Sequence, residues 1–209
     1  MYTVVNMSLP FKLSSNNTCL IVIDKQISYT TDDPAIGRIL GQDGINPFDA
    51  LLPRIDAFIE RCRQKDIEVV WTKMVEDSDQ SPANIRNKML ADGSPTLSDP
   101  TNERFEINGL QPRENERVLT KRYYDAFAQT ELDDYLRSKG IENVILIGAY
   151  ASRCVLGTAF GANGHNYNVV VVTDLIGNPD RFADELRSVD SIVNTTLGYA
   201  LPEQDLDLI

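Results

Sequence analysis

The sequence predicts a single α/β domain in which a mostly parallel sheet carries helices on both of its faces. Short apolar runs rich in Val and Ile alternate along the chain with longer stretches in which apolar residues recur at helical spacing. Strands that alternate with helices form parallel sheets, because each helix carries the chain back across a face of the sheet. The chain has 209 residues, which suits one domain with a sizeable core, so residues 1–209 are assigned to one domain.

The positions of the elements follow from these patterns. Residues 18–24 are apolar on both faces, as in a central parallel strand, and Pro47 begins a helix with an apolar stripe. Expected strands cover 18–24, 67–72, 117–120, 144–147, 168–173 and 198–201, and expected helices cover 47–65, 82–90, 130–139, 154–164 and 179–194. Residues 25–46 are expected to form a loop. The polar stretch 74–115 is long for a connection, so we expect it to form a lid or one wall of a site.

The charge of the chain narrows the class of partner. The formal net charge is −11, which disfavours nucleic acid and anionic membranes and leaves a small molecule as the expected substrate. The first residues show no secretory signal, and no apolar run approaches the ~20 residues that span a membrane. The three cysteines are far apart, so neither a disulfide scaffold nor a zinc cluster is expected. We therefore expect a cytoplasmic protein.

One stretch, from Gly148 to Thr158, is entered by a buried strand and left by a helix. This pattern places Cys154 in the first turn of the helix, where backbone N–H groups and the helix dipole favour a thiolate. The same N–H groups could hold a developing oxyanion. We therefore expect Cys154 to be reactive, whereas Cys19, inside a strand, and Cys62, on an apolar helix face, are expected to lie in the core.

A reactive cysteine needs a base, and His165 is the only histidine in the sequence. It lies eleven residues beyond Cys154, a rise of ~16 Å along a helix, so a cysteine–histidine pair is disfavoured. The carboxyl ends of parallel strands share one edge of the sheet, and Asp24 and Lys121 each end a strand there. Asp24 is therefore expected to be the base, and Lys121 to favour the thiolate electrostatically.

No metal and no cofactor is expected. A single histidine rules out a His-based metal site, and Glu76, Asp77 and Asp79 are interpreted as an exposed acidic loop rather than as oxygen ligands. Gly157 and Gly161 lack the order of a phosphate-binding loop. They are expected instead to let their helix pack closely against its neighbours.

Four stretches carry a resemblance to a known family, and their order along the chain makes it specific. They cover residues 20–26 (LIVIDKQ), 119–127 (LTKRYYDAF), 148–158 (GAYASRCVLGT) and 167–174 (YNVVVVTD). Over nearly its whole length the chain resembles the isochorismatase-like cysteine hydrolase superfamily. The resemblance implies a three-layer α/β/α sandwich with a six-stranded, mostly parallel sheet, and a dimer or tetramer.

The resemblance also implies the residues of the site. The family's Asp–Lys–Cys triad corresponds to Asp24, Lys121 and Cys154, and its non-proline cis peptide bond to Ala149–Tyr150. Backbone N–H groups near Tyr150 and Cys154 would then form the oxyanion hole.

At two places the sequence differs from branches of this superfamily, and these differences restrict the activity that we expect. Nicotinamidases of this superfamily hold a metal with an Asp and two His after the second strand, but this chain has Trp-Thr-Lys-Met at 71–74. Leu-Thr-Lys at 119–121 and Gly-Ala-Tyr-Ala at 148–151 are similar to the true isochorismatase branch. That branch, however, typically has Gly at the position of Cys154, and Lys-Trp-Arg-Tyr where residues 121–124 read Lys-Arg-Tyr-Tyr. The body of the chain resembles an isochorismatase, and its reactive centre resembles an amidohydrolase.

Three hypotheses follow. The first is a metal-independent cysteine hydrolase that cleaves the C–N bond of a small amide or ureido compound through a thioester on Cys154. The second is an isochorismatase-type vinyl-ether hydrolase with Asp24 as general acid and no nucleophile, and the third is a non-catalytic binding protein on the same fold. Candidate substrate-binding residues are Gln26, Tyr29, Trp71, Tyr124, Phe127 and Tyr150, with Arg153 as a candidate partner for an anionic group.

Overall fold

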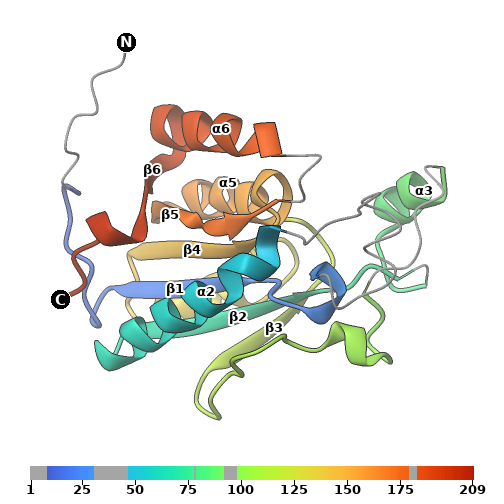
Figure 1. Cartoon of the computed structure of the whole chain (residues 1–209), viewed down its shortest axis with the longest axis horizontal. Helices are drawn as coiled ribbons and strands as arrows, with labels where there is room; N and C mark the ends of the chain where they lie inside the picture. The colour runs from blue at the N-terminus through green and yellow to red at the C-terminus, as the bar shows by residue number, and fades with distance from the viewer. Residues whose placement is uncertain (1–8, 31–46, 78, 92–97, 179–182) are drawn as a thin grey trace.

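A single sheet organises the protein (Figure 1). The computed structural model describes residues 9–30, 47–77, 79–91, 98–178 and 183–209. Its strands are β1 (Thr18–Ile23), β2 (Glu68–Met74), β3 (Arg117–Lys121), β4 (Asn143–Ala149), β5 (Asn168–Gly177) and β6 (Gly198–Leu201). They lie in the order β3-β2-β1-β4-β5-β6, and every neighbouring pair is parallel. The predicted six-stranded, mostly parallel sheet is confirmed.

Helices cover both faces of this sheet (Figure 1). On one face α2 (Pro47–Gln64) packs on the side chains of Leu20 and Val22. On the other face residues of α4 (Leu132–Ser138), α5 (Leu156–Gly164) and α6 (Ala183–Ile192) belong to one hydrophobic core with Ile21 and Ile23. Successive side chains of β1 therefore pack into two different hydrophobic cores, one on each face, because side chains alternate along a strand. The predicted three-layer α/β/α sandwich is confirmed, and α3 (Ala83–Ala91) lies apart from these layers.

Several element boundaries differ from those expected. Strand β5 continues through Asp174 to Gly177, and its pairing with β4 shifts register between Leu146 and Gly148. A π-helical turn, Val193–Leu197, joins α6 to β6. The expected loop over 25–46, the expected lid over 74–115 and the start of the expected helix over 179–194 lie partly outside the described residues. None of the helices in the described ranges is long and apolar enough to cross a membrane.

The strand register brings three carboxyl ends to one edge of the sheet. Ile23 pairs with Thr72 of β2 and with Gly148 of β4, and Met74 pairs with Lys121 of β3. Gly148 has a φ of 114°, and a Cβ there would lie 2.1 Å from the carbonyl oxygen of Ile23. Glycine is therefore required for β4 to approach β1 this closely, just before the cysteine turn.

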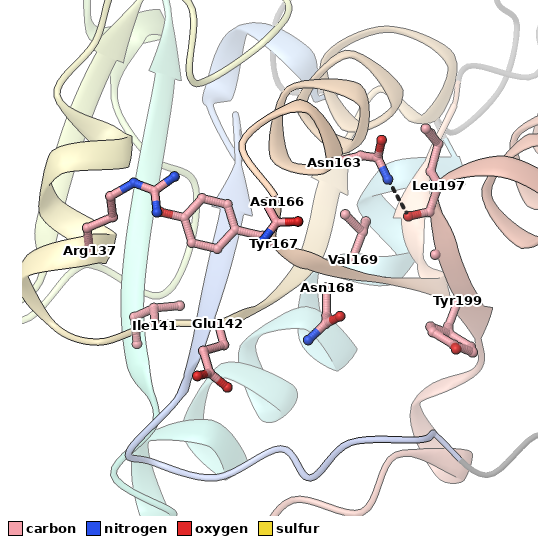
Figure 2. A pocket seen from close by; sticks show the side chains of 11 residues that line it. Arg137, Ile141, Glu142, Asn163, Asn166, Tyr167, Asn168, Val169, Leu197 and Tyr199 are labelled. Carbon is pink, nitrogen blue, oxygen red and sulfur yellow. Dashed lines mark hydrogen bonds between the residues drawn. The ribbon is translucent and has the colours of Figure 1, made fainter.

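A polar pocket of about 470 Å³ lies at the opposite edge, where β4, β5 and β6 begin (Figure 2). Polar groups that line it are bonded within the protein. Asn163 Nδ2 donates to the carbonyl of Leu197 at 3.2 Å, and Arg137 Nη2 donates to the carbonyl of His165 at 3.0 Å. This pocket is separated by the length of the sheet from the edge that carries Asp24, Lys121 and Cys154.

Candidate active site

Asp24 is the residue that directly follows β1. Its φ of 49° is in the left-handed region, which turns the chain away from the strand. The backbone N–H of Asp24 donates to the carbonyl oxygen of Thr72 at 3.2 Å, and the Thr72 hydroxyl donates to Asp24 Oδ1 at 2.7 Å. Neighbouring strand β2 thus fixes both the backbone and the carboxylate of Asp24.

The last residue of β3, Lys121, connects the other two groups. Its Nζ lies 2.7 Å from Asp24 Oδ2 and 3.2 Å from Cys154 Sγ, and it also donates to the carbonyl of Tyr123 at 3.2 Å. Burial opposes the charged ammonium, but the neighbouring charges of Asp24 and Cys154 outweigh burial, so the pKa of Lys121 is raised. Lys121 therefore carries a positive charge between a carboxylate and a sulfur atom.

Cys154 lies in a π-helical turn, Ala151–Val155, and α5 begins only at Leu156. The expected position of Cys154 in the first turn of the helical segment is confirmed, but this turn is π-helical rather than α-helical. The carbonyl of Tyr150 accepts hydrogen bonds from the N–H groups of Arg153 (3.0 Å) and Val155 (3.2 Å), which closes the wider turn around the cysteine. The peptide bond Ala149–Tyr150 is cis, at the position that the family resemblance implies.

Cys154 is only 6% exposed, and this burial affects the pKa of its thiol. Burial raises the pKa of Cys154 well above its ordinary value; Lys121 lowers it, and the charge of Asp24 together with a hydrogen bond to Asp24 raises it again. This direction is opposite to the one expected from the sequence, because loss of hydration outweighs the adjacent positive charge of Lys121. A thiol with a raised pKa needs a base, and Lys121 Nζ links Cys154 Sγ at 3.2 Å to the carboxylate of Asp24 at 2.7 Å.

Aromatic side chains lie around Asp24, Lys121 and Cys154. The rings of Tyr29 and Tyr150 meet edge to face with centroids 5.5 Å apart, and the Tyr150 hydroxyl donates to the carbonyl of Tyr29 at 3.3 Å. Burial raises the pKa of Tyr29, and nearby Glu76, Asp24 and Cys154 raise it further. Tyr124 is 41% exposed, and the pKa of its phenol is raised by burial and by the charges of Glu76 and Cys154. Three of the predicted wall residues, Tyr29, Tyr124 and Tyr150, thus lie in this region.

Trp71 and Phe127 do not lie in this region, which corrects the prediction that they line a substrate site. Trp71 packs in the core on the α2 face, opposite the face that holds Cys154, and its Nε1 donates to Glu116 Oε2 at 2.7 Å. The ring of Phe127 stacks on His165 with centroids 5.0 Å apart, beyond the far end of α5. Both aromatic residues serve packing.

Gln26 is fully buried and holds neighbouring loops together. Its Nε2 donates to Ser98 Oγ at 2.8 Å and to the carbonyl of Phe105 at 3.0 Å, and its Oε1 accepts from the N–H of Met74 at 2.7 Å. The amide is thus committed to bonds within the protein, so the expectation that Gln26 binds substrate is replaced by a supporting position beneath the site.

Two residues near the triad were not predicted. Thr72 orients the Asp24 carboxylate, and a threonine hydroxyl inside a buried strand gives no separate signal in the sequence. Glu76, interpreted from the sequence as part of an exposed acidic loop, is part-buried, and its Oε2 accepts a hydrogen bond from the Tyr29 hydroxyl at 3.1 Å. Its burial depends on Tyr29 and Ser98, which are distant in the chain.

The close approach expected of Gly157 and Gly161 is confirmed. A Cβ on Gly157 would lie 3.1 Å from the backbone of Tyr124, and one on Gly161 would lie 2.1 Å from Asp125 Oδ1. These two glycines allow the segment that carries Tyr124 to lie directly on α5.

The end of β2 and the two residues that follow it do not fit the metal site of the nicotinamidases. Of the positions from Trp71 to Glu76, only Glu76 carries a side chain that binds hard metal ions, and its carboxylate accepts a hydrogen bond from Tyr29. Across the described ranges, no group of three or more His, Cys, Asp or Glu side chains could hold a metal ion.

Comparison with known proteins identifies the family. Residues 18–195 match the family model of the isochorismatase domain. The chain is 26% identical to the secreted isochorismatase effector Isc1 of Verticillium dahliae, over 82% of this chain and 78% of that protein. It is 25% identical to the ureidoacrylate amidohydrolase RutB of Methylorubrum extorquens, over 87% and 79% of the two chains.

A solved structure shares the fold. The cysteine hydrolase from Pseudomonas syringae pv. phaseolicola superposes with a TM-score of 0.77 at 18% identity, covering 93% of this chain and 92% of that one. This likeness shows the fold. From the domain match over most of its length, the chain belongs to the isochorismatase family and, like its amidohydrolase relatives, is a hydrolase.

Proposed function

We propose that this protein hydrolyses the C–N bond of a small amide or ureido compound through a thioester on Cys154, without a metal. The observation that carries the proposal is the position of Lys121 Nζ, 2.7 Å from Asp24 Oδ2 and 3.2 Å from Cys154 Sγ. A nucleophile, a base and a fixed positive charge thus form one buried group, which is the arrangement that covalent catalysis requires.

The reaction begins with proton transfer. Asp24 takes the thiol proton as Cys154 Sγ attacks the substrate carbonyl carbon, and Lys121 stabilises the negative charge that develops on sulfur. The backbone N–H groups of Tyr150 and Cys154 would bind the oxyanion, and one such donor is commonly worth ~3–4 kcal/mol. Asp24 then protonates the leaving amine as the C–N bond breaks. Water attacks the thioester with Asp24 as base, which releases the acid and restores the thiol.

The relatives support a C–N bond as the target. RutB of Methylorubrum extorquens is named as a ureidoacrylate amidohydrolase, and a maleamate amidohydrolase of Pseudomonas putida is 31% identical over 46% of this chain. Both names describe the cleavage of small compounds that carry an amide or ureido group. We infer a substrate of this size and class here.

A second candidate is vinyl-ether hydrolysis, which the isochorismatase relative of Verticillium dahliae favours. In that reaction Asp24 would act as general acid and Cys154 would form no bond. Cys154→Ala separates the two candidates, because it abolishes amide hydrolysis and leaves vinyl-ether hydrolysis intact. Asp24→Asn is expected to abolish both.

The proposal is tested by an ammonia-release screen over small amides and ureido compounds, with the Cys154→Ala protein as the blank. The expected result is release by the wild-type protein above that blank for at least one compound. Silence across the panel together with turnover of isochorismate would support the second candidate. Silence on both would support a non-catalytic binding protein.

We further propose that the protein acts in the cytoplasm as a dimer or tetramer, with a small molecule as its partner and without nucleic acid or membrane. Sedimentation equilibrium measures the assembly directly, and a monomer at micromolar concentration would contradict it.

A further inference from the structure

We propose that Glu76 determines specificity: its carboxylate accepts a hydrogen bond from a substrate N–H group next to the carbonyl that Cys154 attacks. Primary amides and ureido compounds with a free N–H are then preferred over compounds whose nitrogen carries only alkyl groups. This inference rests on the proposed amide chemistry. It identifies the N–H group beside the carbonyl as the part of the substrate that the site recognises.

The backbone of Glu76 is held at the edge of the sheet that carries the triad. Glu76 lies two residues beyond β2, and it exchanges backbone hydrogen bonds with Ser98 of 3.0 and 3.3 Å. The preceding residue, Val75, donates its N–H to the carbonyl of Lys121 at 2.9 Å. Glu76 is therefore fixed on both sides, beside the residue that bridges Asp24 and Cys154.

The side chain of Glu76 is oriented by one hydroxyl. Tyr29 donates to Oε2 at 3.1 Å, and the ring of Tyr29 is itself held edge to face against Tyr150. Oε1 accepts no hydrogen bond from any residue in the described ranges, and no cation in those ranges lies within 4 Å of the carboxylate. One oxygen is thus anchored, and the other keeps its capacity to accept.

The surroundings of the Glu76 carboxylate increase the free energy that a substrate gains by donating a hydrogen bond to Oε1. Burial raises the pKa of Glu76; the bond from Tyr29 and the charges of Lys121 and Arg153 lower it, and the charge of Asp24 raises it. A part-buried carboxylate that has lost water gains more from a ligand hydrogen bond than an exposed one does. The N–H of an amide or ureido group supplies such a donor, and an N,N-dialkyl amide does not.

Two alkylating reagents test this without knowledge of the natural substrate. Iodoacetamide reacts with Cys154 while presenting an amide N–H₂, and N,N-dimethyl-2-iodoacetamide presents the same carbonyl without a donor. The quantity measured is the rate of Cys154 alkylation by iodoacetamide divided by the rate with N,N-dimethyl-2-iodoacetamide. Both rates are determined by peptide mass spectrometry on the folded protein. Dividing this ratio by the same ratio for glutathione, a free thiol, corrects for the intrinsic difference in reactivity between the two reagents.

Glu76→Gln is the informative variant, because it is nearly isosteric. The Gln carbonyl takes the place of Oε2 as acceptor for Tyr29, so its N–H₂ group stands where Oε1 was, and an acceptor becomes a donor. We expect the rate ratio to fall about 10- to 100-fold, the worth of a hydrogen bond to a charged group. Glu106→Gln is the matched control, since Glu106 pairs with Lys73 at the surface, and it should leave the ratio unchanged.

The outcomes are distinguishable. If Cys154 is alkylated and the ratio is the same in wild-type and Glu76→Gln protein, the inference is overturned while the proposed function stands. If neither reagent modifies Cys154 in the folded wild-type protein, the nucleophile of the proposed function is contradicted and the inference falls with it. A fall in the ratio for Glu76→Gln, but not for Glu106→Gln, establishes the N–H contact.

Discussion

Lys121 Nζ lies 2.7 Å from Asp24 Oδ2, and neither side chain is more than 1% exposed. Two opposite charges buried in this way depend on each other, because removing one leaves the other away from water and without an opposite charge. Lys121→Met is therefore expected to lower the free energy of unfolding by about 3–5 kcal/mol, measured by urea denaturation. Lys139→Met, which removes an ion pair to Glu68 from a side chain that is 47% exposed, should cost less than about 1 kcal/mol. Similar losses for the two variants would show that the buried pair is not coupled.

The hydroxyl of Thr72 orients the carboxylate of Asp24, the proposed base. Thr72→Val keeps the shape of the side chain and removes the donor to Asp24 Oδ1, leaving a buried carboxylate oxygen with one bond fewer. We expect a loss of about 1–3 kcal/mol in the free energy of unfolding, together with a lower kcat/KM. Thr72→Ser retains the hydroxyl and should recover most of both losses. If Thr72→Ser is as impaired as Thr72→Val, packing rather than the hydrogen bond is responsible.

Buried thiols make the protein less stable in alkali. Burial raises the pKa of Cys62 from 9.0 to about 12, so between these values the unfolded chain loses a proton that the folded chain keeps. Stability therefore falls as pH rises from about 9 to about 12, by up to ~1.4 kcal/mol per pH unit for this thiol. Denaturation at pH 8, 9, 10 and 11 should show a shallower decline for Cys62→Ala than for wild type. If the free energy of unfolding of the two proteins falls equally with pH, Cys62 does not contribute to the loss of stability in alkali.

Gly148 permits the close approach of β4 to β1. An added Cβ would lie 2.1 Å from the carbonyl oxygen of Ile23, and neither backbone atom can move independently of the sheet. Gly148→Ala is expected to cost more than about 3 kcal/mol and to abolish activity. Gly140 also has a positive φ, 69°, but a Cβ added there would meet no atom within 4 Å, so Gly140→Ala should cost only ~1–2 kcal/mol. Thermal unfolding of both variants checks the difference.

The gathering of Asp24, Lys121 and Cys154 could be predicted because it follows from topology. Each residue stands at the carboxyl end of a parallel strand, and those ends share one edge whatever the details of packing. The direction in which the pKa of Cys154 is shifted could not be predicted in the same way. Local sequence suggests an N-terminal helix position that favours a thiolate, whereas the pKa is governed by burial, which depends on the whole fold.

The side chains around the triad were harder to predict. Trp71 lies in a strand that is buried on both faces, so its sequence does not show which face carries the indole. Phe127 follows Lys121 closely in the chain, yet an irregular segment carries it to the far end of α5. Glu76 has the sequence signature of a solvent-exposed acidic loop, and only contacts with Tyr29 and Ser98 bury it. In each case long-range packing decides the position.

The central claim is that Cys154 forms a covalent bond with the substrate. The most direct measurement is the mass of the Cys154 peptide after acid quenching during turnover of an amide identified by ammonia release. The account predicts an added mass equal to the acyl group on that peptide, and no ammonia release by Cys154→Ala. Ammonia release by Cys154→Ala at the wild-type rate, with no modified peptide in the wild type, would contradict it.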